Sequence, residues 1–125
     1  MNNELKTLEQ RADRAFSRLV VLRGRCEKCG CRYHLETHHL VRRAIHAARW
    51  VTGLALCLCD NCHRLDATAA HANPDAFDAW LTERMPETAA LRDEYLYRRC
   101  CEKVSQQEVE AVCEELEGQL YGVAA

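Results

Sequence analysis

Hydrophobic and polar positions follow a helical period at the N-terminal end of the chain. Apolar residues recur at three- and four-residue spacing, from Leu5 and Leu8 to Leu19 and Val20, with charged residues between them. This spacing places the apolar side chains on one face of an α-helix. An amphipathic helix is therefore expected over residues 3–22.

Two short segments in the middle of the chain have the pattern of β-strands. Residues 35–41 alternate between apolar and polar side chains, and residues 54–59 form an apolar run of strand length. We expect a hairpin of these strands, joined by a basic loop or short helix at residues 42–53. Adjacent side chains on a strand point to opposite faces. His38 and His39 therefore diverge unless a bulge or turn brings both to one side.

Helical patterns fill the remainder of the chain. Pro74 suits the first turn of a helix, and Ser105 with Glu108 three residues later is a capping box, which marks a helix start. The pattern as a whole predicts an α+β fold, in which a small hairpin and a helix are surrounded by N- and C-terminal helices. The expected helices cover residues 61–70, 75–85, 88–103 and 106–120.

Length and charge narrow the classes of protein that fit. A chain of 125 residues is expected to form one domain with a modest core. It contains no apolar segment of membrane-spanning length and no signal-peptide pattern, so we expect a cytoplasmic protein. Between Arg23 and Trp50 there are seven Lys and Arg against two Glu, whereas from Cys100 onward six Glu face one Lys. The basic segment favours a phosphate-bearing partner such as nucleic acid.

Nine cysteines in a chain expected in the cytoplasm indicate metal binding rather than disulfides. Cys26 and Cys29 form one C-x2-C pair, and Cys59 and Cys62 form a second. Two such pairs fit the tetrahedral shell of a structural zinc ion. The pattern predicts a metal site strongly and a particular function only weakly.

The remaining cysteines leave alternatives open. Cys31 or Cys57 can replace one of the four ligands, since Cys57 shares a strand face with Cys59. Three others lie in helical segments without a partner histidine, where we expect them to act as small apolar residues. These are Cys100, Cys101 and Cys113.

The order of these motifs resembles that of the HNH endonucleases. A C-x2-C pair is followed by His38-His39, a return strand, and a second pair with His63 directly after it. The small phage and prophage members are most similar, because Arg49-Trp50 precedes the second strand and His71 begins a His-x-Asn-Pro stretch. The resemblance covers residues 15–81. It implies a zinc-stapled ββα-metal finger.

The same resemblance divides the chain into two parts. It implies a nuclease domain with its N-terminal helix over residues 1–85. Residues 86–125 are then a helical extension that packs on this domain. Because this extension is acidic, it is also the expected contact for a protein partner.

The resemblance also implies the roles of individual residues. His39 falls on the general base, and His38 and His63 fall on ligands of a second, catalytic divalent ion, for which Mg, Mn, Ni and Zn are candidates. His71 becomes a third ligand or a phosphate contact if an extra helical turn separates it from His63. The implied reaction is hydrolysis of phosphodiester bonds in DNA, above all double-stranded DNA. The expected contacts to its phosphates are Arg42, Arg43 and Arg49.

One position departs from the family pattern. A count from Trp50 to Cys59 without a gap puts the family's asparagine at Leu54. A leucine side chain cannot form the hydrogen bonds that hold the loop and orient the base. The departure leaves an alternative function open, a catalytically inactive zinc module of the same descent that binds nucleic acid or a protein partner.

Overall fold

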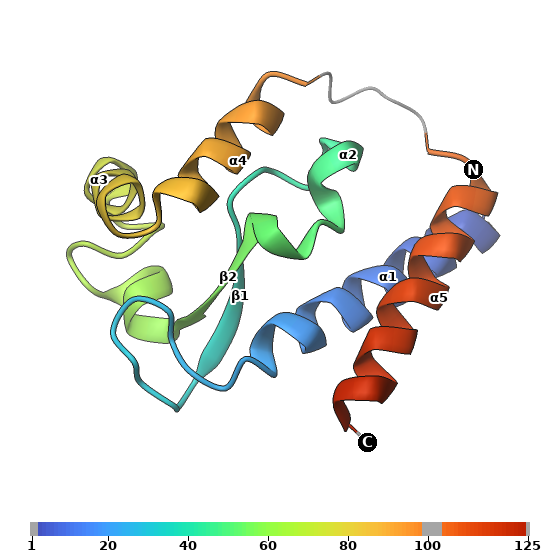
Figure 1. Cartoon of the computed structure of the whole chain (residues 1–125), viewed down its shortest axis with the longest axis horizontal. Helices are drawn as coiled ribbons and strands as arrows, with labels where there is room; N and C mark the ends of the chain where they lie inside the picture. The colour runs from blue at the N-terminus through green and yellow to red at the C-terminus, as the bar shows by residue number, and fades with distance from the viewer. Residues whose placement is uncertain (1–2, 99–103, 125) are drawn as a thin grey trace.

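The structure, a computed structural model, describes residues 3–98 and 104–124. It is an α+β fold with a two-stranded antiparallel sheet at the centre and helices on both sides (Figure 1). In the part of the chain that is described, no helix combines the length and apolar character needed to cross a bilayer. The elements are α1 Asn3–Val21, β1 Leu35–His39, α2 His46–Arg49, the 3-10 helix η1 Thr52–Leu54, β2 Ala55–Cys59, the π-helix η2 Asn61–Leu65, α3 Pro74–Arg84, α4 Pro86–Leu96 and α5 Gln106–Ala124.

Most elements agree with the sequence pattern. The N-terminal helix, the hairpin and the helices beginning near Pro74 and Gln106 are all present. The backbone N–H of Glu108 donates to Oγ of Ser105, as a capping box requires. α5 continues to Ala124, past the expected end. α4 begins earlier than expected, at Pro86, and the end expected at residue 103 lies outside the described residues.

The helix expected over residues 61–70 is wrong beyond Leu65. Asp66 has an extended backbone at the C-cap of η2. Its carboxylate accepts hydrogen bonds from the backbone N–H and the hydroxyl of Thr68. Such local bonds from an aspartate offer the backbone an alternative to helical bonding. Residues 66–73 therefore form a loop.

The two faces of the sheet carry different residues. The β1–β2 ladder is continuous over all of β1, without a bulge. His38 therefore lies on the face toward α3, where its ring contacts Phe77 edge-on, and His39 lies on the opposite face, where it stacks on Phe16 of α1. The prediction that the two histidines diverge in the absence of a bulge is confirmed.

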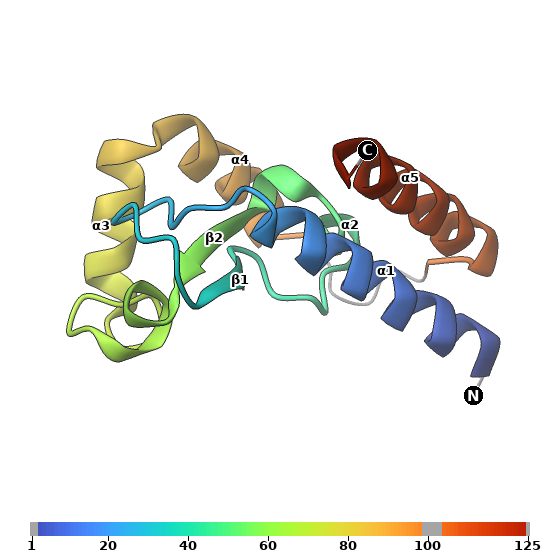
Figure 2. The same cartoon turned by 90° about the horizontal axis from the view of Figure 1, so that it is seen from below.

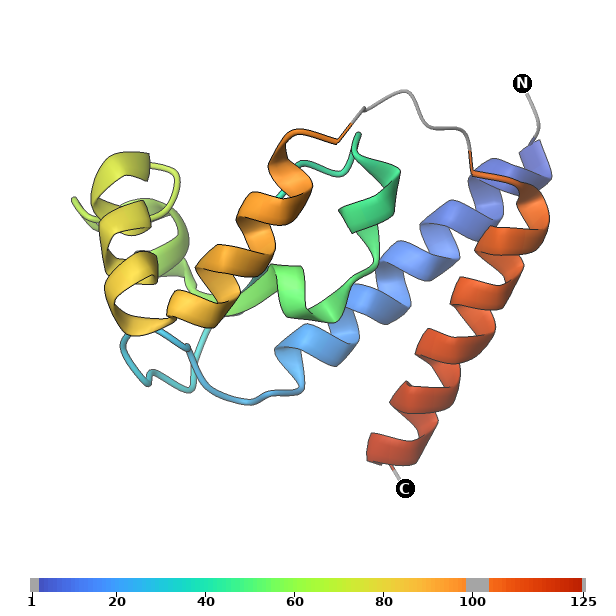
Figure 3. The same cartoon turned by 45° about the horizontal axis from the view of Figure 1, so that its top comes forward.

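An apolar cluster lies on each side of the sheet. On one side, α1 packs against Ala55 and Cys57 of β2, and α5 lies alongside α1 (Figures 1 and 2). On the other side, α3 packs on Leu56 and Leu58. The two helices of the first side separate toward the C-terminal end of α5 (Figure 3). The hairpin is thus covered on both faces.

The outer edge of β2 is closed by the segment that carries the first cysteine pair. The backbone N–H of Glu27 donates to the carbonyl of Cys57 at 2.8 Å, and the Glu27 carboxylate accepts from the N–H of Cys57 at 2.7 Å. Arg23 donates to the carbonyls of Thr52 and Ala55, each at 2.8 Å. These bonds fix η1 and β2 relative to the first cysteine pair.

Candidate metal centres

Four cysteines form a compact cluster at one end of the hairpin. The sulfur atoms of Cys26, Cys29, Cys59 and Cys62 all lie within 4.8 Å of one another. Zinc–sulfur bonds of about 2.3 Å put the sulfurs of a tetrahedral site about 3.8 Å apart, and the Cys29 and Cys59 sulfurs are 3.6 Å apart. The cluster can therefore hold a structural metal such as zinc.

The first cysteine pair is shaped by its turn. Gly30 has a φ of +83°, a conformation that L side chains rarely adopt, and its N–H donates to the carbonyl of Cys26. Burial by itself would raise the pKa of the Cys26 thiol. Backbone N–H donors from Cys29, Cys59 and Lys28 outweigh burial and lower this pKa to about 7. The turn therefore stabilises a thiolate, the form that binds metal.

The second pair spans the end of β2 and the start of η2. Burial and the neighbouring thiols raise the pKa of Cys62, and burial also raises that of Cys59. Without a cation, these buried thiols are protonated at neutral pH. A bound metal ion reverses this preference, because its charge stabilises the thiolates.

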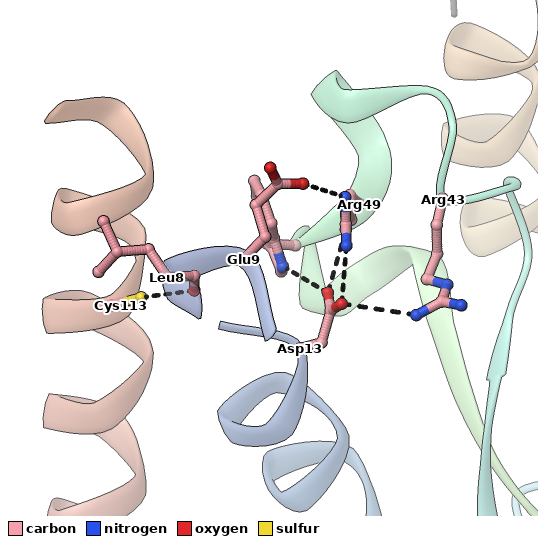
Figure 4. Close-up of polar contacts among 7 residues, drawn as sticks. Leu8, Glu9, Asp13, Arg43, Arg49 and Cys113 are labelled. Carbon is pink, nitrogen blue, oxygen red and sulfur yellow. Dashed lines mark hydrogen bonds and ion pairs between the residues drawn. The ribbon is translucent and has the colours of Figure 1, made fainter. Parts of the chain in front are cut away.

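The other cysteines that the structure describes lie outside the four-cysteine cluster. Cys57 is buried between the sheet and α1, and the Cys31 sulfur accepts a hydrogen bond from the N–H of Tyr33. Cys113 is buried, and its thiol donates to the carbonyl of Leu8, as Figure 4 shows. Cys100 and Cys101 lie outside the described residues.

Three histidines form a second cluster next to the first. The ligating nitrogens of His38, His63 and His71 lie within 4.8 Å of one another. Nε2 of His63 and Nε2 of His71 are 3.0 Å apart. Zinc–nitrogen bonds of about 2.0–2.1 Å separate the ligands of a tetrahedral site by about 3.3 Å. The cluster therefore has the spacing of a metal site with three protein ligands.

Different elements supply the three histidines. His38 comes from β1 and His63 from η2, directly after Cys62 of the cysteine cluster. His71 comes from the loop, and not from an added helical turn. The N–H groups of Ala70 and His71 donate to the carbonyls of Cys62 and His63, each at 3.0 Å. These bonds dock the loop on η2 and bring His71 beside His63.

Within the histidine cluster, the surroundings of His38 favour a neutral imidazole. Burial, followed by the charges of His63 and His71, lowers the pKa of His38 to about 3. His38 is therefore unprotonated at neutral pH, as a metal ligand must be. Phe77 covers one edge of the site.

The cluster is contacted by a carboxylate, Glu36, which the sequence analysis did not identify. Oε1 of Glu36 lies 2.7 Å from Nδ1 of His63. Arg64 donates to both carboxylate oxygens of Glu36. The signal in the sequence is the strand period, because Glu36 is two residues before His38 and shares its face.

His39 does not join the histidine cluster. Its ring lies against Phe16, with 5.4 Å between the ring centroids and nearly parallel planes. Burial, and then the charge of Arg43, lowers its pKa. Among the described residues, no side-chain polar atom is both buried and without a partner. No described residue forms a hydrogen bond with a ring nitrogen of His39. Both nitrogens are therefore in contact with solvent.

The three arginines expected to bind phosphate differ in their surroundings. Arg49 donates to Asp13 and Glu9 at 2.7–3.0 Å, and only 14% of its side chain is exposed (Figure 4). Arg43 is 59% exposed and makes one longer contact, 3.5 Å, with Asp13. Arg42 is exposed. Arg49 would have to leave two carboxylates to reach a phosphate.

Leu54 is buried in an apolar cluster of its own. It is 2% exposed and packs with Val41, Ile45 and Ala48, against Leu91 of α4. Its carbonyl accepts from the N–H of Leu40 at 2.9 Å. The backbone of Leu54 thus ties the loop to the end of β1, while its side chain belongs to the core.

Comparisons of the chain with models of protein families, with curated proteins and with solved structures found no match. The geometry of the two ligand clusters is therefore the basis for a functional proposal.

Proposed function

We propose that this protein is a metal-dependent endonuclease of the HNH type that hydrolyses phosphodiester bonds in DNA. The observation that carries the proposal is the cluster of His38, His63 and His71 beside a four-cysteine site. The succession of β1, β2 and η2 is the order expected of a ββα-metal finger. Zinc in the cysteine cluster would staple this unit together.

The histidine cluster suits a late transition metal. Imidazole ligands favour zinc, nickel and related ions, whereas magnesium prefers oxygen ligands. Three protein ligands of a tetrahedral ion leave one position open for an oxygen of the scissile phosphate. An ion bound there would supply Lewis-acid stabilisation of the charge that develops on that phosphate.

His39 is the candidate general base. A base must be unprotonated and must reach a water molecule, and the lowered pKa and solvent contact of His39 fit both needs. His39 is the last residue of β1, so a phosphate that crosses the end of the strand can meet both faces.

Arg42 and Arg43 are the phosphate contacts retained in the proposal. Both are exposed in the segment that follows β1. Such contacts set the position of the protein on DNA without reading its sequence. We leave Arg49 out, because its guanidinium is already bound to Asp13 and Glu9.

Leu54 favours one alternative, a zinc module of the same descent that binds nucleic acid without cutting it. The side chain that would orient His39 in the family is missing. The loop itself is nevertheless held by the backbone of Leu54 and by Arg23, which bonds the carbonyls on both sides of it. A loop held in this way without the asparagine side chain supports the active form.

Nicking of supercoiled plasmid DNA tests the proposal. We expect cleavage with Mn²⁺, Ni²⁺ or Zn²⁺, and a rate loss of about 100-fold or more in His39→Ala, the range for removal of a general base. His63→Ala should lose both cleavage and the second metal ion. His34→Asn is the matched control, because His34 is exposed at a positive φ that asparagine tolerates.

Two results separate the alternatives. Salt-sensitive DNA binding without product under any of these ions would support the inactive module. Cleavage that survives in His39→Ala would contradict the assigned base.

A further inference from the structure

The geometry points to Glu36 as a positioning residue that fixes how His63 binds the second metal ion. The inference deepens the proposed function and rests on the histidine cluster being a metal site. Glu36 would act through the His63 ring and would not touch the metal.

The contact is short and specific. Oε1 of Glu36 lies 2.7 Å from Nδ1 of His63. The His63 side chain is only 13% exposed, whereas that of Glu36 is 31% exposed. A carboxylate oxygen can only accept, so Nδ1 carries the proton in this pair.

The position of this proton decides which nitrogen binds the metal. With the proton on Nδ1, neutral His63 has a free lone pair on Nε2. Nε2 is the atom that faces His71, at 3.0 Å from its Nε2. The Glu36 contact therefore directs the lone pair of His63 into the cluster and makes the ring a stronger ligand.

Arg64 keeps Glu36 in this supporting role. Its Nε donates to Oε1 at 3.1 Å, and its Nη2 donates to Oε2 at 2.7 Å. Both carboxylate oxygens are thereby occupied. Glu36 is also not part of the set of groups whose ligand atoms lie within 4.8 Å of one another.

The strand register fixes the backbone position of Glu36. Glu36 and His38 lie two residues apart on β1, on the same face of the sheet. Glu36 pairs with Leu58 and His38 with Leu56, both of which are buried. β1 thus carries both the candidate ligand His38 and Glu36, which contacts the candidate ligand His63 on η2.

Metal titration without nucleic acid tests this inference. Zinc-loaded protein is titrated with Ni²⁺ by calorimetry, for the wild type, Glu36→Ala and Glu36→Gln. We expect Glu36→Ala to weaken binding of the second ion by about 10–100-fold, the usual effect of removing such a support. Glu36→Gln keeps an acceptor for the Nδ1 proton and should lose less than about tenfold.

A spectroscopic measurement accompanies the titration. Nitrogen-15 spectra of the protein before Ni²⁺ addition should show His63 with its proton on Nδ1, and Glu36→Ala should shift the ring toward the other tautomer. Glu83→Ala is the matched control, since Glu83 is exposed on α3. Zinc content and thermal unfolding are measured for each variant, to check that it keeps its fold.

The outcomes separate the two proposals. Equal Ni²⁺ affinity in the wild type and in Glu36→Ala, or a His63 proton on Nε2 in the wild type, would overturn the role of Glu36 alone. If Glu36→Ala weakens Ni²⁺ binding but the wild type does not cleave DNA, the role of Glu36 is sustained and the nuclease proposal is contradicted. A wild type that binds no second ion would overturn both.

Discussion

At the scale of single residues, Leu54 has different roles for its side chain and its backbone. The HNH endonucleases, which the sequence resembles, have asparagine at the corresponding position, whereas the Leu54 side chain belongs to an apolar cluster with Val41, Ile45 and Ala48. Its backbone still bonds β1 through Leu40. Apolar packing and this backbone bond therefore hold the loop, and a polar side chain at residue 54 is not needed for its conformation.

Replacing Leu54 by asparagine should destabilise the protein. The change removes a buried apolar side chain and leaves an amide without partners, at a cost of about 3 kcal/mol. Urea unfolding measures the difference. Leu54→Met is the control and should cost less than about 1.5 kcal/mol, because it conserves apolar volume.

The same variant also addresses activity. We expect no gain of nicking in Leu54→Asn, since the new amide would have to leave the cluster to reach His39. A stable variant with faster cleavage would show that the loop repacks, contrary to the packing described above.

At the scale of elements, ion pairs join α1 to the segment between the strands. Asp13 accepts from Arg49 and from Nε1 of Trp50, at 2.7–3.0 Å (Figure 4). Burial by itself would raise the pKa of Asp13, but the bonds from Arg49 and Trp50 outweigh it and lower the pKa. These contacts fix α2 on α1.

Asp13→Asn should therefore destabilise the protein in a pH-dependent way. We expect a loss of about 1–2 kcal/mol at pH 7, a charged hydrogen bond discounted for partial exposure. The pKa of Asp13 in the folded protein lies below the unfolded value of about 3.9. Asp13 therefore contributes fully to the free energy of unfolding at pH values above about 3.9. This contribution is lost as the pH falls through the lower, folded pKa.

The measurement compares urea unfolding of the wild type and Asp13→Asn from pH 8 down to acid. The difference in the free energy of unfolding should stay constant above about pH 5 and narrow below about pH 4. Acid would remove a thiolate-bound metal from both proteins alike, so the readout is the difference between their free energies of unfolding. A difference that grows as the pH falls would contradict the role of Asp13.

The agreement between pattern and structure also varies by element. The period of α1 and the strand-like run of β2 were sufficient to locate both, because each buries a regular set of apolar side chains. η2 ends early because Asp66 bonds Thr68 locally. Its π-helical form and the docking of His71 depend on backbone bonds that no local pattern encodes.

At the scale of the whole molecule, the cysteine cluster connects segments that are distant in sequence. Cys26 and Cys29 precede the hairpin, whereas Cys59 and Cys62 end it. A structural zinc contributes a free energy on the order of 10 kcal/mol, comparable with the total stability of a domain this small. A metal ion in this cluster would therefore also help to fix the position of His63, since Cys62 and His63 are adjacent.

Removal of this metal should unfold the region around the hairpin. We expect about one tightly held zinc per chain, and loss of cooperative thermal unfolding after treatment with a chelator. Cys59→Ser should lose the zinc and bind Ni²⁺ poorly. Cys31→Ser is the matched control and should keep both, because Cys31 lies outside the cluster; zinc content by mass spectrometry distinguishes the two.

The helical extension is part of the same core. Val109, Cys113 and Leu116 of α5 are buried in the cluster that contains Ala12 and Phe16 of α1. The apolar stripe of α1, which the sequence predicts, thus finds its partner near the other end of the chain. The outer face of α5 carries exposed glutamates, among them Glu110 and Glu114.

The sequence by itself determined the α+β class, the hairpin, the four-cysteine cluster and the divergence of His38 and His39. These follow from local periods and from ligand spacing, which act over a few residues. The sequence left open whether His71 is a third ligand or a phosphate contact, and tertiary structure brings it beside His38 and His63. Tertiary structure alone decided that Glu36 contacts His63 and that Arg49 binds α1. Such contacts depend on how separate segments approach one another, and that approach is set by burial of apolar surface and by backbone bonds between elements.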